Sequence, residues 1–281
     1  MTFARRRRLL AAGLLALVAP ATAALAAPRA DFVGHRAVYE MRLDDRSDRG
    51  EVADVSGRFV YEFSGSRCEG WASRFRFVTR LDGADGRARV TDLRTSSFEA
   101  ADGRSFDFFN ENWIDQKKVE ESKGRARRDE TGISLRLERP QAKDLALAPA
   151  VKFPTEHLAA IVAAAEAGRT IAEIDLYDGS ETGEKTYRTT VVIGREATGA
   201  DEPGEEPAAL GDLLEGHRRW PVDVSFFDLA KTGGTDALPD YRLSFLLYDN
   251  GVSRRLRLDY GSFALKGVLS SLEALPAAPC P

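Results

Sequence analysis

The sequence predicts a mostly β protein: a large antiparallel sheet, curled into a spiral or barrel-like shape, with one main α-helix. Three observations support this. Short segments alternate apolar and polar residues, turn dipeptides such as Asp-Gly and Asn-Gly separate them, and residues 153–168 alone have strong helical periodicity. A sheet of about 12–14 strands usually curls or closes. A two-sheet sandwich is the second architecture that this pattern allows.

The first 26 residues have the pattern of a secretory signal peptide. Four arginines at 5–8 precede an apolar run at 9–19, and Ala24-Leu25-Ala26 matches an Ala-x-Ala cleavage site. The apolar run is shorter than the roughly 20 residues that a membrane-spanning helix needs. We therefore expect residues 1–26 to be removed on export, and residues 27–281 to form a single domain that is not an integral membrane protein.

Composition argues against a nucleic-acid partner. The signal segment contains four of the 40 basic residues and none of the 44 acidic ones, so the mature chain has a formal charge of −8. An acidic chain is repelled by phosphate backbones. The hydrophobic fraction of 43% is sufficient for a sizeable core.

The chain has two cysteines, Cys68 and Cys280, and both lie in the exported part. In an oxidising compartment two such cysteines most simply form one disulfide. It would fasten the end of the chain to an early strand. The closed loop exceeds 200 residues, so the chain-entropy model gives about 4–5 kcal/mol of stabilisation.

The strands are predicted from alternation and from the turns between them. Residues 71–81 form a long alternating strand, with Trp71, Phe75 and Phe77 on one face and arginines on the other. Residues 241–248 and 252–260 form a hairpin around Asn250-Gly251. The remaining predicted strands are 37–43, 58–63, 87–98, 105–114, 117–126, 133–137, 171–177, 186–193, 220–227 and 263–272. Residues 117–126 and 133–137 are expected at the sheet edge, and residues 141–152 are expected to lack regular structure.

Residues 153–168 are predicted to form the helix. Thr155 is the expected N-cap, and Gly168 the expected residue just after the C-terminus. Four apolar residues share one helix face at i, i+3, i+4 and i+7: Leu158, Ile161, Val162 and Ala165. We expect this face to cover core apolar surface. In the alternative hypothesis the helix, residues 155–167, closes a ligand cavity and can move.

The sequence contains no pattern that specifies a catalytic, cofactor or metal site. Nucleophile-elbow, zinc-protease and phosphate-binding glycine motifs are missing. The three histidines are widely spaced, and a structural zinc needs about four ligands. Glu205 and Glu206 lie in the acidic stretch 198–207, which is expected to be an exposed loop without a partner acid or base. No role is assigned to that loop.

Several motifs resemble those of the EipB family of periplasmic cell-envelope integrity proteins of alphaproteobacteria. They are CEG at 68–70, FPTEH at 153–157, LYDGS at 176–180, RRWPV at 218–222 and LYDNGVSRRLRLDYG at 247–261, with a lone cysteine near the C-terminus. The resemblance covers essentially the whole mature chain. It implies an antiparallel β-spiral of about fourteen strands, a disulfide that maps onto Cys68 and Cys280, and no known catalytic or metal residues.

From the resemblance and the residues together we expect a non-enzymatic periplasmic protein that supports envelope integrity under stress. The second hypothesis is a carrier or binder of an apolar ligand, such as an acyl chain, in a cavity of the curled sheet. A hydrolase of envelope polymers is a third, and a module that docks on an envelope protein is a fourth. The sequence identifies neither the ligand, the protein partner nor the oligomeric state.

Overall fold

The structure, a computed structural model, describes residues 31–45, 52–199, 202–231, 238–277 and 280. The predicted signal peptide, residues 1–26, lies outside the described residues. Within the described part, none of the helices combines the length and the apolar character needed to cross a bilayer.

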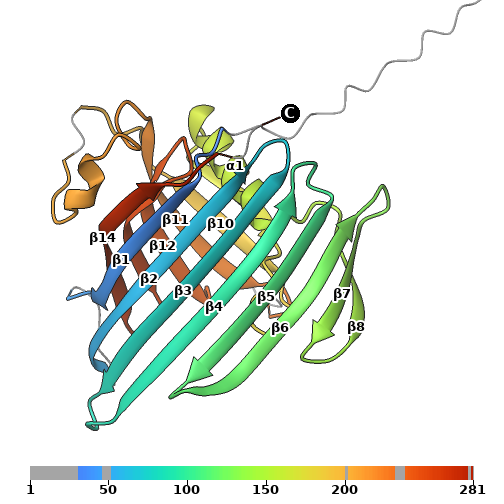
Figure 1. Ribbon diagram of the computed structural model, residues 1–281, viewed down its shortest axis with the longest axis horizontal. Coiled ribbons are helices and arrows are strands. Elements are labelled where there is room, and N and C mark those ends of the chain that lie inside the picture. Colours follow the sequence, from blue (N-terminus) through green and yellow to red (C-terminus); the bar gives the residue numbers. More distant parts are fainter. Residues whose placement is uncertain (1–30, 46–51, 200–201, 232–237, 278–279, 281) are drawn as a thin grey trace, which may run out of the picture.

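Across the described ranges, fourteen strands form one antiparallel sheet. They are β1 (His35–Leu43), β2 (Val52–Ser66), β3 (Gly70–Gly83), β4 (Ala88–Ala100), β5 (Ser105–Ile114), β6 (Lys117–Arg128), β7 (Ile133–Arg139), β8 (Lys143–Leu147), β9 (Ile171–Leu176), β10 (Tyr187–Ile193), β11 (Arg219–Asp228), β12 (Tyr241–Tyr248), β13 (Ser253–Asp259) and β14 (Ala264–Ala274). The sheet curls, so that β10 to β12 lie behind β1 to β4 (Figure 1). The curled sheet is confirmed, and the sandwich alternative is wrong because all fourteen strands are hydrogen-bonded neighbours in one sheet.

The first and last strands, β1 and β14, are neighbours at the middle of the sheet. One arm runs outward from β1 to β8, and the other runs from β14 back to β9. The helix α1 (Pro154–Glu166) connects the two outer strands. These edges do not pair directly, but Lys152 bridges Leu176 at the end of β9. The sheet is therefore a spiral that is closed in part by the chain segment before α1.

The strand register divides each long strand into an inner and an outer face. Trp71, Phe75 and Phe77 lie on one face of β3, as predicted, and pack with inner-face aromatic rings. Arg76 lies on the other face, where its guanidinium donates two hydrogen bonds of 2.8 Å to Asp92 of β4. Exposed pairs of this kind contribute about 0–1 kcal/mol each, so inward burial is the larger stabilising term for these strands.

Three expectations about secondary structure are wrong. Residues 117–126 and 133–137, expected at the sheet edge, lie in β6 and β7, which have a neighbouring strand on each side. Residues 141–152, expected to lack regular structure, include β8, the actual edge strand, which is short and charged and pairs only with β7 among the described strands. The N-cap of α1 is Phe153 rather than Thr155. Sequence preference failed there because a carboxylate from another strand binds the first backbone N–H groups of the helix. The predicted role of Gly168 is confirmed, with φ at +69° just after the helix.

Candidate functional site: the inner face of the curled sheet

The inner face is covered by apolar side chains that are only partly buried in its central region. Strand pairing places them on the same face as the core clusters. We call these residues the inner-face set: Phe59, Tyr61, Ser73, Phe75, Phe77, Leu93, Thr95, Ser97, Ile174, Tyr241, Leu243, Phe245 and Leu258, all of intermediate exposure. Partial exposure of so many apolar groups on a concave face indicates room beside them, because a packed interior leaves almost none.

The helix α1 packs against one end of this face. Ile161, Val162 and Ala165 are buried among side chains that include Val191 and Val224, and Leu158 is partly buried against the same cluster. The predicted helix face therefore covers core apolar surface. Movement of the helix stays a prediction.

The N-terminus of α1 is held by a carboxylate from β4. Glu99, 4% exposed, accepts hydrogen bonds from the backbone N–H groups of Thr155 (2.8 Å) and Glu156 (3.1 Å). Burial, and next the nearby Glu156 carboxylate, raise the pKa of Glu99 to about 7, although the donated hydrogen bonds oppose this shift. Glu99 thus performs from a distant strand the role of a local capping residue.

Two further side-chain contacts fix the same helix end. Arg128 of β6 forms a two-pronged ion pair with Glu156, with a shortest distance of 2.7 Å, and both side chains are largely buried. The Nε2 atom of His157 lies 2.8 Å from Oγ1 of Thr189 on β10. Burial lowers the pKa of His157 to about 4. The helix is consequently tied to both arms of the spiral.

The inner-face set also contains polar groups. Ser73 and Ser97 pair through their hydroxyls at 2.8 Å, on adjacent strands. The hydroxyls of Tyr61 and Tyr241 make no hydrogen bond with any described residue, and burial raises the pKa of both phenols. These phenols could bond a polar group that enters the inner space.

The loop after β9 crosses the inner face of β5 and β6. The carbonyl of Gly179 accepts hydrogen bonds from the Asn110 side-chain amide (2.6 Å) and the Ser122 hydroxyl (2.9 Å). Gly179 has φ at +70°, and a Cβ atom there would lie 2.4 Å from the Phe108 ring. The LYDGS motif therefore needs its glycine for both backbone conformation and close approach.

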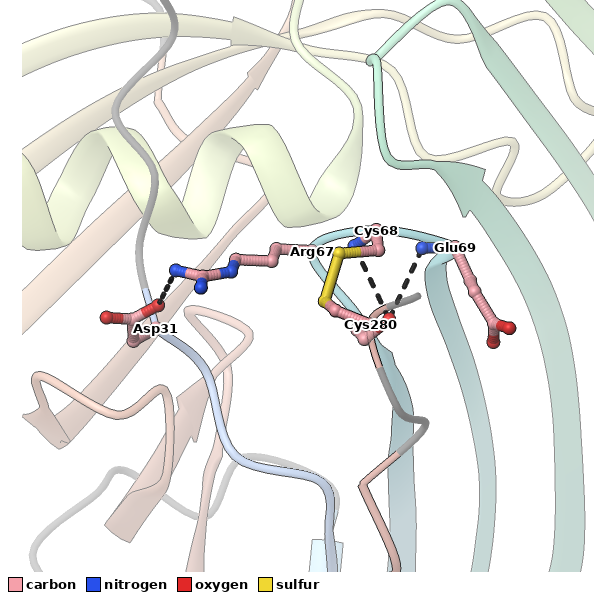
Figure 2. Close-up of a disulfide and its surroundings, with 6 residues drawn as sticks. Asp31, Arg67, Cys68, Glu69 and Cys280 are labelled. Carbon is pink, nitrogen blue, oxygen red and sulfur yellow. Dashed lines mark hydrogen bonds and ion pairs between the residues drawn. A yellow bond between two sulfur atoms is a disulfide. The ribbon is translucent and has the colours of Figure 1, made fainter.

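The disulfide between Cys68 and Cys280 is present, with Cα atoms 5.5 Å apart. Cys68 lies in the turn between β2 and β3, where Ser66 Oγ accepts hydrogen bonds from the backbone N–H groups of Cys68 and Glu69 (Figure 2). The neighbouring Arg67 pairs with Asp31, just before β1. The turn thus contacts segments near both ends of the folded domain.

The expectation that Glu205 and Glu206 have no partner is wrong. Glu206 is buried and pairs with buried Arg254, and Glu205 pairs with Arg42 and Lys266. Both basic partners of Glu205 and the partner of Glu206 lie on strands distant from this loop in sequence. The alternating pattern of β13 places an arginine at position 254, but periodicity does not show which acid reaches it.

The histidines do not form a cluster. His35 lies on β1, His157 on α1, and His217 before β11, where its Nδ1 is 2.6 Å from Asp249 Oδ1. The Nε2 atom of His217 makes no hydrogen bond within the described residues, so no nucleophile is joined to this His–Asp pair there. No group of three or more potential ligands in the described part is arranged to hold a metal ion.

Comparison with known proteins assigns the chain to a family. A family model described as EipB-like matches residues 26–276. The cell envelope integrity protein EipB of Brucella abortus (strain 2308) is 38% identical over 253 residues, covering 90% of this chain and 88% of that protein. The crystal structure of a beta-barrel-like protein of domain of unknown function DUF1849 from Brucella abortus superposes with a TM-score of 0.79. It is 36% identical and covers 88% of this chain and 100% of that one. The chain belongs to the EipB-like family.

Proposed function

We propose that this protein is a non-enzymatic periplasmic protein, a single domain of residues 27–281, that supports cell-envelope integrity under stress. The export pattern at residues 1–26 and the name of the Brucella abortus relative support this proposal. We further propose that it acts by binding an amphiphile, with an acyl chain against the inner face.

The observation that carries ligand binding is the partial exposure of the inner-face set. Phe59, Phe75 and Phe77 form edge-to-face contacts that hold their rings in place. A preformed apolar surface of this kind favours an apolar ligand, because burial gains about 25 cal/mol per Å². The phenol of Tyr61 or that of Tyr241 would bond the polar group of the ligand, which distinguishes an amphiphile from a pure hydrocarbon.

Two neighbouring serines on β4 provide a matched test. Ser97 faces the inner space opposite Ser73, whereas Ser96 faces outward opposite Arg74. Both have intermediate exposure. Ser97→Phe should fill inner space and reduce the amount of co-purified lipid, and Ser96→Phe should not. Native mass spectrometry and lipid extraction of periplasmic protein measure this, with melting curves confirming that both variants fold.

The envelope role is tested separately in the host. Deleting the gene should increase sensitivity to detergents, and the wild-type and Ser96→Phe genes should restore resistance. Failure of Ser97→Phe to restore it would connect the inner face to the role. If wild-type protein contains no lipid and Ser97→Phe restores resistance fully, ligand binding is refuted and the envelope role stands. Unchanged sensitivity after deletion would refute the envelope role itself.

A further inference from the structure

The side-chain carboxylate of Glu206 is bound by hydrogen-bond donors that all belong to strands of the sheet. Its Oε2 atom accepts a hydrogen bond of 2.8 Å from Nη1 of Arg254. Its Oε1 atom accepts two hydrogen bonds, both of 3.0 Å, from the backbone N–H groups of Arg255 and Leu269. The side chains of Glu206 and Arg254 are 5% and 0% exposed. A buried guanidinium requires a partner of opposite charge, since an uncompensated buried charge is very unfavourable.

Irregularities in two strand pairs explain why these two N–H groups are available. Arg255 has φ at +57°, and the register of β12 and β13 shifts beside it. A bulge leaves a residue out of the ladder. Leu269 lies beyond the last β13–β14 pair, Leu256 with Gly267, so the ladder with β13 does not extend to it. The bulge in β13 and the end of the β13–β14 ladder thus leave two backbone N–H groups directed at one carboxylate oxygen, which makes an anion-binding concavity.

The segment that supplies the carboxylate is the docking loop, residues 202–218. Arg254 and Arg255 also donate side-chain hydrogen bonds to the carbonyl of Glu202, at 3.1 and 2.8 Å. Beyond Glu206, Ala209 and Leu214 cover Tyr248 and neighbouring apolar residues of the β12–β13 hairpin. Figure 1 shows the loop in orange beside β14. The loop thus covers apolar surface through a contact centred on one carboxylate.

We propose that the bulge of β13, the neighbouring backbone N–H of Leu269 on β14 and the side chain of Arg254 form a carboxylate-binding site, and that Glu206 is its intramolecular ligand. The site is a property of the sheet and persists when the side chain of residue 206 is removed. It then binds a small external carboxylate in the same place. A planar carboxylate matches the arrangement, one oxygen meeting two N–H groups and the other the guanidinium. A hollow of about 290 Å³ beside it, lined by Glu205, Arg257 and Lys266 among others, provides access.

Chemical rescue tests this proposal. Glu206→Ala should raise the unfolding equilibrium constant on the order of a hundredfold or more, because the buried guanidinium of Arg254 loses the carboxylate that Glu206 supplies. Formate or acetate should restore stability in a saturable manner, and chloride or phosphate at equal ionic strength should not. Thermal and urea unfolding of the purified protein measure both effects. Glu205→Ala is the matched control: it removes an adjacent exposed carboxylate, and formate should not change its stability.

Equal effects of formate and chloride on Glu206→Ala would overturn the proposal, as would the same rescue of Glu205→Ala. If Glu206→Ala does not fold, Glu206→Gln and Glu205→Gln provide the second comparison. The glutamine at 206 retains an acceptor for the two N–H groups but no charge for Arg254. Glu206→Gln should be markedly less stable than Glu205→Gln, and equal stability of the two would refute a charge-dependent site.

Discussion

Glu99 on β4 caps the helix α1 by accepting a 2.8 Å hydrogen bond from the backbone N–H of Thr155, a residue 56 positions later in the chain. This contact joins the wall of the spiral to the helix that covers its inner face. Because the carboxylate is buried, the contact also makes stability depend on pH. The pKa of Glu99 is raised and that of His157, in the first turn of the same helix, is lowered.

Replacing Glu99 by Gln should make the protein more sensitive to acid. The folded-state pKa of Glu99 is about 7, above its unfolded value of about 4.5, so the folded state binds the extra proton. Glu99 therefore favours folding increasingly as pH falls from 7 to 4.5, by up to about 1.4 kcal/mol per pH unit. Urea unfolding of wild type and Glu99→Gln between pH 4.5 and 7 measures the difference in slope. Parallel curves would contradict the prediction.

Replacing His157 by Gln should have the opposite effect. Its folded-state pKa of about 4 is below the unfolded value of 6.5, so the unfolded state takes up the proton first. Wild type should lose His157-dependent stability as pH falls from 6.5 to 4, and His157→Gln should not. The wild type should be less dependent on pH between 4.5 and 6.5 than either variant, since the two contributions oppose each other. The same slope in His157→Gln and wild type would show that the imidazole does not titrate in this window.

Reducing the disulfide should lower stability substantially. The bridge joins residues separated by 212 positions, and a loop of that size corresponds to about 5 kcal/mol in the chain-entropy model, with strain reducing the measured value. A thiol count on periplasmic protein should give no free thiols. Thermal melts with and without reductant measure the effect, and Cys68→Ser, which reductant should not affect further, is the control. Equal melting temperatures with and without reductant would show that the disulfide does not stabilise the fold.

Gly179→Ala should destabilise far more than Gly86→Ala. Both glycines have positive φ, at +70° and +78°, so each alanine costs on the order of 1 kcal/mol for backbone strain. Only at 179 does the new Cβ meet the Phe108 ring, at 2.4 Å, while nothing lies within 4 Å of it at 86. Overpacking should add roughly 1–3 kcal/mol at 179. Urea unfolding measures the free energy of unfolding of both variants. Equal losses would show that the loop accommodates the added methyl group at 179 without an energetic penalty.

Local structure could be predicted from the order of residues alone. Alternation in residues 71–81 and Asn-Gly at 250–251 specify a strand and a hairpin, because side-chain direction and turn geometry depend on near neighbours. The apolar face of α1 and its end at Gly168 are local in the same sense. Cys68 and Cys280 could be paired without coordinates only because the chain contains no other cysteine.

Contacts between segments that are distant in sequence became known only from the folded structure. Glu99 replaces a local N-cap for α1, Glu206 finds Arg254, and β8 pairs with β7 despite a charged, short sequence. None of these contacts has a periodic signature, since each joins groups that the curl of the sheet brings together. The candidate site shares this origin. Alternation predicts that Phe59 and Leu243 lie on apolar strand faces, but only the curvature of the sheet turns those faces inward and leaves them partly exposed.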